Sequence, residues 1–158
     1  MTNDAQSKLH AAETLLASES TVFEHPEENR LDVYFPQHEL IKLIQLLRDT
    51  EWGYLASITG VDPGAETNEI EVIYHFCWGA AVLGLRTRVA RDQGKIPSIC
   101  SIIPSASFFE RELSEMFGID VEGTPVPERL FLPDNWPDGV YPLRKDYTPE
   151  GVSRPGEG

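Results

Sequence analysis

Two neighbouring segments with a period of two constrain the fold more than any other feature of the sequence. Residues 69–78 and 81–90 each alternate apolar with polar or small side chains, and Gly79-Ala80 lies between them. Successive side chains of a strand point to opposite faces, so each segment predicts one apolar and one polar face. The sequence therefore predicts an antiparallel hairpin with its apolar face inward and with Arg86 and Arg88 outward.

Five further segments precede or adjoin this hairpin in an α+β domain. Apolar side chains spaced three and four apart predict helices over residues 4–18 and 36–49. Strands are expected at residues 21–24 and 30–35, joined as a hairpin, and at residues 54–61. The inner face of the second helix comprises a central stripe and two residues that widen it: Leu40, Leu43, Ile44, Leu47, Ile41 and Leu46.

A third, shorter helix is expected over residues 105–117. Ser107 and Glu110 have the spacing of a capping box, and Gly118 suits the left-handed residue that ends a helix. We therefore predict an α+β core domain over residues 1–119. It has a mixed, largely antiparallel sheet with two or three packed helices.

Residues 120–158 form a long irregular C-terminal arm in this prediction. Prolines and glycines prevent regular structure over about 30 residues. The arm nevertheless keeps many apolar side chains, which disordered segments usually lack. It must cover them on its own domain or in the groove of a partner, and we favour docking on a partner. The apolar side chains are Leu130, Phe131, Leu132, Trp136, Val140, Tyr141, Leu143 and Tyr147.

The charge of the chain limits its partners. A formal net charge of −13 and a pI near 4.6 argue against nucleic acid and against direct binding to anionic lipid. A basic protein surface suits this charge better, and so does simple solubility. No apolar run has the length of a membrane span, and residues 1–6 have no features of an export signal. Any membrane association is therefore expected to pass through other proteins.

An acidic cluster on the third helix is the only candidate for chemistry by side chains alone. Glu110, Glu112 and Glu115 could act in general acid–base catalysis. However, Glu110 and Glu112 lie about 200° apart around a helix, so they cannot share one substrate atom. A structural role is favoured, and an acid–base enzyme using Glu112, Glu115 and Arg111 is kept as an alternative. A third hypothesis is a binding module that holds a basic partner through net charge.

The sequence offers no set of residues for a metal or a redox centre. Cys77 and Cys100 stand apart and predict buried free thiols, although their spacing leaves a disulfide open. His75 beside Cys77 lacks a third and a fourth metal ligand. Two cysteines cannot supply the four ligands of an iron–sulfur cluster. We therefore expect no catalytic residue, cofactor site or metal site in this chain.

Three motifs resemble one known family, the 30-kDa subunit of respiratory complex I. Phe109-Glu110-Arg111-Glu112-Leu113-Ser114-Glu115-Met116-Phe117-Gly118-Ile119 is similar to its signature, with Phe108 in place of the usual Trp and Ser114-Glu115 in place of Tyr-Asp. Residues 130–136 and 141–147 resemble its C-terminal block, and the likeness extends over about residues 20–150. The Trp136–Arg144 run looks closer to the related subunits of membrane-bound hydrogenases.

The resemblance implies a cofactor-free subunit in the peripheral arm of an NADH- or ferredoxin-quinone oxidoreductase, or of a membrane-bound energy-converting hydrogenase. NAD or ferredoxin, quinone and iron–sulfur clusters would then bind other subunits, which also translocate protons. The chain would dock on the 49-kDa-type, hydrogenase large-chain-like subunit at the cytoplasmic face of the cell membrane. Interface residues are expected on the third helix and the arm: Glu110, Arg111, Glu112, Arg129, Trp136, Tyr141, Leu143, Arg144, Lys145 and Tyr147.

Overall fold

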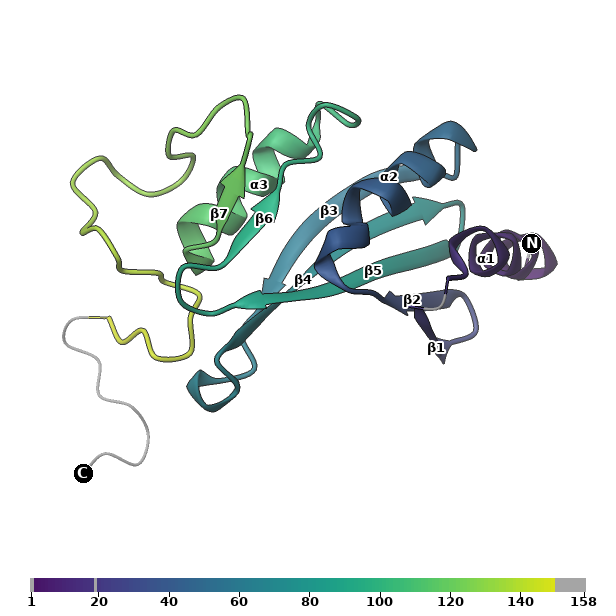
Figure 1. Cartoon of the computed structure of the whole chain (residues 1–158), viewed down its shortest axis with the longest axis horizontal. Helices are drawn as coiled ribbons and strands as arrows, with labels where there is room; N and C mark the ends of the chain where they lie inside the picture. The colour runs from purple at the N-terminus through teal and green to yellow at the C-terminus, as the bar shows by residue number, and fades with distance from the viewer. Residues whose placement is uncertain (1, 19, 150–158) are drawn as a thin grey trace.

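The computed structural model describes residues 2–18 and 20–149, and it forms an α+β fold as predicted (Figure 1). The helices and strands are α1 (Thr2–Leu16), β1 (Val22–Glu27), β2 (Arg30–Tyr34), η1 (Gln37–Glu39), α2 (Leu40–Asp49), β3 (Tyr54–Val61), η2 (Ala65–Thr67), β4 (Glu69–Trp78), β5 (Ala81–Ala90), β6 (Lys95–Pro97), α3 (Ala106–Phe117) and β7 (Asp120–Glu122).

The main sheet has five strands in the order β1-β2-β5-β4-β3. The predicted hairpin forms its centre, because β4 and β5 pair antiparallel from Glu69 opposite Ala90 to Trp78 opposite Ala81. The pairing of β2 with β5 is parallel, whereas β1 with β2 and β3 with β4 are antiparallel. The expectation of a mixed, largely antiparallel sheet is confirmed.

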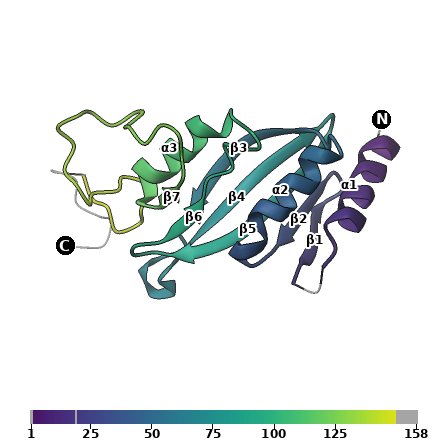
Figure 2. The same ribbon diagram turned by 45° about the horizontal axis from the view of Figure 1, so that its top comes forward.

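Helix α2 lies across the sheet in both views of the ribbon, and α1 packs beside it (Figures 1 and 2). The central stripe of α2 is confirmed, since all four of its residues are at most 1% exposed. Ile41 was expected to widen this stripe, which is wrong because 39% of its surface is exposed, whereas Leu46 packs partly against the core. Residues spaced three and four apart cover only the arc of the helix that contacts the sheet.

The prediction for helix α3 is wrong at its first residues and confirmed at its last. Its N-cap is Ser105, and no side chain caps it, so the predicted capping box of Ser107 and Glu110 is wrong. The predicted end is confirmed, because Gly118 has φ +72° and donates its N–H to the carbonyl of Ser114.

A second, small sheet was not expected from the sequence. Strand β7 pairs parallel with β6, and Val121 is buried although it follows the third predicted helix. Three-residue strands are too short to produce a recognisable alternation of side chains. The prediction that regular structure ends at residue 119 therefore missed β7. The irregular part of the chain starts after Glu122.

Candidate functional site

The C-terminal arm is described up to residue 149, and we call residues 123–149 the arm segment. It contains neither helix nor strand and runs along α3 and β7 in both ribbon views (Figures 1 and 2). The remainder of the predicted arm, residues 150–158, lies outside the described residues. The geometry of the arm segment depends on polar side chains that bind its backbone.

Two side chains on one face of α3 hold the start of the arm segment. Arg111 donates from Nε and Nη2 to the carbonyls of Glu128 and Arg129, at 2.8 and 2.7 Å. Glu115, one helical turn further, accepts the backbone N–H of Phe131 at 3.0 Å. Charged partners make these hydrogen bonds stronger than neutral ones. Arg111 and Glu115 thus fix an irregular backbone to the helix.

Arg129 closes a loop within the arm segment. Its guanidinium donates to the carbonyls of Pro133 and Trp136, at 2.9 and 3.0 Å, and pairs with Asp138 at 3.1 Å. The indole N–H of Trp136 donates to the carbonyl of Val140 at 2.8 Å. These contacts replace the backbone ladder that prolines cannot form.

Arg144 connects the arm segment to two parts of the body. It donates to the carbonyls of Phe117 and Arg91, at 2.8 and 2.6 Å, and lies 3.3 Å from the carboxylate of Asp92. Its guanidinium also stacks over the Tyr141 ring, 4.5 Å from the centroid. Only 11% of its side chain is exposed, and its guanidinium forms its hydrogen bonds within this chain.

The end of the arm segment is anchored on a buried ion pair between Asp62 and Arg91. Asp62 accepts the backbone N–H of Lys145 at 2.7 Å and that of Gly64 at 2.9 Å. Arg91 Nη2 lies 3.0 Å from Asp146, an ion pair without hydrogen-bond geometry. Burial alone would raise the pKa of Asp62, but hydrogen bonds from Arg91, Lys145 and Gly64 lower it to about 2.

The Asp62–Arg91 pair was missed by the sequence analysis. The two residues stand at the ends of β3 and β5, and no local pattern links them to each other or to residues 144–146. The only available signal was the polar position of Asp62 before the turn Pro63-Gly64.

Apolar side chains of the arm segment are left partly uncovered by these contacts. Phe131 and Leu143 are 62% and 53% exposed, and Phe108 at the start of α3 is 60% exposed. Trp136, Tyr141 and Tyr147 are half-buried. The structure therefore divides the predicted interface residues between those that hold the arm backbone and those that present aromatic or aliphatic surface. Their role in binding a partner stays a prediction.

Glu110 is buried, whereas the other expected interface residues are half-buried or exposed. It is 2% exposed and accepts hydrogen bonds from Ser98 Oγ (2.8 Å), the Ile99 N–H (2.7 Å) and the Cys100 thiol (3.1 Å). Burial chiefly raises the pKa of Cys100 to about 11, with the Glu110 hydrogen bond adding to this, so the thiol stays protonated at neutral pH. Glu112 is half-buried on the same helix.

The structure shows where the other candidate groups lie. His75 bonds Thr59 through Nε2 at 2.9 Å, and Cys77 and Cys100 are free thiols. Cys100 is buried as expected, whereas Cys77 is only half-buried. Among residues 2–18 and 20–149, no three His, Cys, Asp or Glu side chains are grouped as a metal site would need. Within the same ranges, none of the helices has the length and apolar composition of a membrane span.

Two solved structures share this fold. A chain of the membrane-bound sulfane sulfur reductase, an archaeal respiratory membrane complex, matches with a TM-score of 0.76 and 24% identity, over 92% of this chain and 86% of that one. The trypsin-resistant fragment (1–134) of Nqo5 matches with a TM-score of 0.60 and 22% identity, over 80% and 99% of the two chains. The α+β body thus has a fold that also occurs in a respiratory membrane complex.

The sequence comparisons define the family. The sequence model of one protein family, the 30-kDa subunit of respiratory-chain NADH dehydrogenase, matches residues 33–153. The chain belongs to this family, as its motifs had indicated.

Its relatives include subunits of several oxidoreductases. The C subunit of NADH-quinone oxidoreductase from Saccharopolyspora erythraea is 33% identical over 132 residues, which are 80% of this chain and 52% of the relative. The beta subunit of the membrane-bound hydrogenase from Pyrococcus furiosus is 40% identical over 111 residues, covering 68% and 62%. The C subunit of the F420H2 dehydrogenase from Methanosarcina mazei is 33% identical over 121 residues, covering 75% of each chain. The chain spans about half the length of its relatives from Saccharopolyspora and Nocardioides.

Proposed function

We propose that this chain is a cofactor-free structural subunit in the peripheral arm of a complex I-like NADH- or ferredoxin-quinone oxidoreductase. It docks through α3 and the arm segment on a 49-kDa-type subunit, which resembles the large chain of nickel–iron hydrogenases. The subunit is peripheral at the cytoplasmic face of the membrane. Its role is to fix the position of neighbouring subunits, because electron transfer between cofactors requires a constant geometry.

One observation carries this proposal: the backbone of the arm segment is fixed while two of its large apolar side chains, Phe131 and Leu143, are more than half exposed. Arg111, Glu115 and Arg129 bind the backbone, whereas Phe131 and Leu143 point into solvent in the isolated chain. A surface that is already ordered loses little conformational entropy on binding. Exposed aromatic and aliphatic side chains on such a surface are suited to act as anchors in a partner.

A second candidate is the corresponding small subunit of a membrane-bound energy-converting hydrogenase. The 40% identity with the Pyrococcus furiosus hydrogenase subunit supports it. Both candidates use the same docking surface, and they differ in the electron carriers of the complex. Identification of the proteins and cofactors that copurify with the tagged chain from its own cells distinguishes them.

The alternative of an acid–base enzyme is not favoured by the geometry. Arg111 and Glu115 are engaged with the arm backbone, which leaves only Glu112 of the three proposed groups. The Glu112→Gln variant separates the two functions. Lost turnover in a normally assembled complex would support chemistry in this chain, and lost assembly would support docking.

The docking surface is tested by a double variant, Phe131→Ser with Leu143→Ser, in the tagged full chain. Tyr54→Ser is the matched control, because Tyr54 is 65% exposed but lies on β3 away from the arm. If the two apolar residues are anchors worth about 2 kcal/mol each, the affinity for the partner subunits falls by roughly 700-fold and their recovery falls with it. Recovery equal to that of the control variant would contradict the proposed docking surface.

A further inference from the structure

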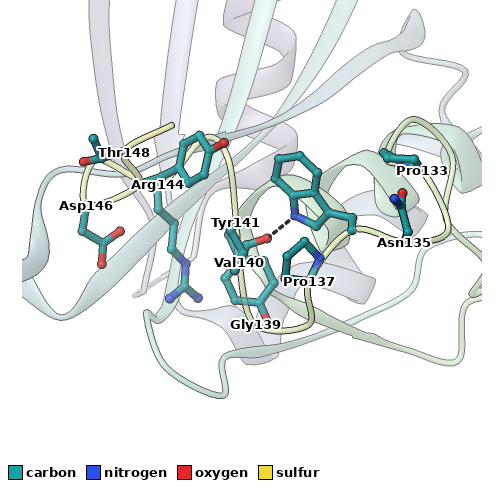
Figure 3. Close-up of a pocket in the computed structure, with 11 residues that line it drawn as sticks. Pro133, Asn135, Pro137, Gly139, Val140, Tyr141, Arg144, Asp146 and Thr148 are labelled. Carbon is teal, nitrogen blue, oxygen red and sulfur yellow. Dashed lines mark hydrogen bonds between the residues drawn. The ribbon is translucent and has the colours of Figure 1, made fainter. Parts of the chain in front are cut away.

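The arm segment lines a cavity, open to solvent, that its proposed docking role does not require. The cavity has a volume of about 790 Å³ and is formed by residues between Pro133 and Thr148. Arg144 and Asp146 lie on one side of it and Pro133 and Asn135 on the other (Figure 3). This volume is large enough for a long side chain of another molecule.

The walls of the cavity are aromatic. Trp136 and Tyr147 both line it, with ring centroids 6.1 Å apart and planes inclined by 44°. The indole N–H of Trp136 is already bonded to the carbonyl of Val140, the bond drawn as a dashed line in Figure 3. Trp136 therefore presents its ring rather than its N–H to an occupant. The face of an aromatic ring carries negative electrostatic potential and attracts cations.

The rim of the cavity is acidic. Asp146 lines it and is 59% exposed, with one carboxylate oxygen 3.0 Å from Arg91. Asp138, adjacent to two lining residues, is fully exposed, with one oxygen 3.1 Å from Arg129. Asp134 is also exposed, and both of its neighbours in the chain line the cavity. The cation within the wall, Arg144, is only 11% exposed and is engaged by two carbonyls, Asp92 and the Tyr141 ring. The exposed carboxylate of Asp134 and the solvent-facing oxygens of the two paired carboxylates favour a positively charged occupant.

Arg144 also shows which kind of cation suits these walls. Its planar guanidinium stacks on Tyr141 at 4.5 Å, within the same aromatic cluster. Arginine is more weakly hydrated than lysine and stacks on aromatic faces. It therefore loses less hydration free energy than lysine when it enters such a cavity. We propose that this cavity receives an arginine side chain of the subunit on which the arm docks. The inference rests on the proposed function and names the chemistry of the partner at that surface.

A binding experiment on the isolated full chain tests the chemistry of the cavity directly. N-acetyl-arginine amide is titrated into the labelled protein and the indole N–H resonance of Trp136 is followed by NMR. The neutral isostere N-acetyl-citrulline amide and the corresponding lysine derivative are titrated in parallel. The expected result is a saturable shift at millimolar concentrations with arginine, a smaller shift with lysine and none with citrulline.

The Tyr147→Leu variant removes one aromatic wall but keeps an apolar side chain. It is expected to weaken arginine binding by about 3- to 30-fold. The Trp136 indole resonance of the free variant checks that the bond to Val140 persists. Equal shifts with citrulline and arginine would show an apolar pocket, and no shift with arginine would show no cation site. Either result overturns the proposal.

The same variant in the assembled complex tests whether the partner supplies the arginine. Tyr147→Leu should lower recovery of the partner by a similar factor, whereas the matched variant Tyr54→Leu should leave it unchanged. Unchanged recovery for Tyr147→Leu would overturn the assignment of the cavity to the partner. The double variant of Phe131 and Leu143 tests the docking surface independently of the cavity. Failure of the arginine site can therefore be distinguished from failure of the proposed docking function.

Discussion

The body of the molecule and its arm segment are stabilised in opposite ways. In the body, apolar side chains from α1, α2, α3 and the sheet form one buried cluster, and the backbone is paired in strands and helices. In the arm segment, charged side chains bind the backbone, while Phe131 and Leu143 remain outside. The body thus uses its apolar residues for its own stability, whereas the arm segment leaves Val126, Phe131 and Leu143 exposed.

This difference separates the stability of the fold from the capacity to dock. A domain that buries a core of this kind gains most of its stability from apolar burial. The arm segment gains its order from individual hydrogen bonds, each contributing about 1.5–3 kcal/mol when a charged group takes part. Substitutions in the two regions should therefore differ in size and in whether they affect the whole molecule or the arm alone.

The largest effect is expected in the body. Leu83 on β5 is fully buried in the core cluster, so Leu83→Ala should lower the free energy of unfolding by about 2–5 kcal/mol. Chemical denaturation of the isolated chain measures this loss. A change below about 1 kcal/mol would contradict the view that this cluster carries the stability of the body.

A smaller, pH-dependent effect is expected at Asp62. Its pKa of about 2 in the folded chain lies below the ordinary value of 3.8, so its contribution is complete above about pH 5. The contribution is about 2 kcal/mol and is lost as the pH falls through 3.8 towards 2. Asp62→Asn should thus be less stable than the original chain by about this amount at pH 6. Denaturation curves at several pH values should show the difference shrinking below pH 4, and a constant difference would contradict the role of the charge.

Gly118 of the body contacts the Tyr141 ring of the arm segment, so its substitution should affect mainly the attachment of the arm. An added Cβ would fall on the Tyr141 ring, and φ is +72°. Gly118→Ala should cost about 1–2 kcal/mol and release the arm segment, which limited proteolysis within residues 123–149 detects. Gly123→Ala is the control, because φ is +83° there and the added atom would meet nothing within 4 Å. Equal protease sensitivity of the two variants would show that the ring contact does not hold the arm.

The smallest effect on stability is expected at the exposed side chains of the arm segment. Phe131→Ser should change the free energy of unfolding of the isolated chain by no more than about 0.5 kcal/mol, because Phe131 is 62% exposed. The measurement is the same denaturation experiment as for Leu83→Ala. A loss above about 1.5 kcal/mol would mean that this side chain stabilises its own fold, which would remove the contrast between the regions.

Most of the body was predictable because its patterns are local. The bounds of β3, β4 and β5 agree with their periodicity, and the stripe of α2 is buried as expected. The main errors concern residues whose partners lie far away in the chain. Glu110 was expected to cap its own helix, but it binds residues 98–100 instead. Strand β7 was missed because its partner β6 precedes α3 in the chain.

The sequence by itself determined the periodic elements of this protein, its family and the irregular character of its arm, since these depend on neighbouring residues and on proline chemistry. Only the tertiary structure decided where the arm lies. Its path depends on Asp62, Arg111 and Arg144, each of which binds backbone groups from about 17 to 83 residues away. A charged side chain recognises a carbonyl or an N–H whatever residue carries it, so such contacts leave no pattern in the sequence that could predict them.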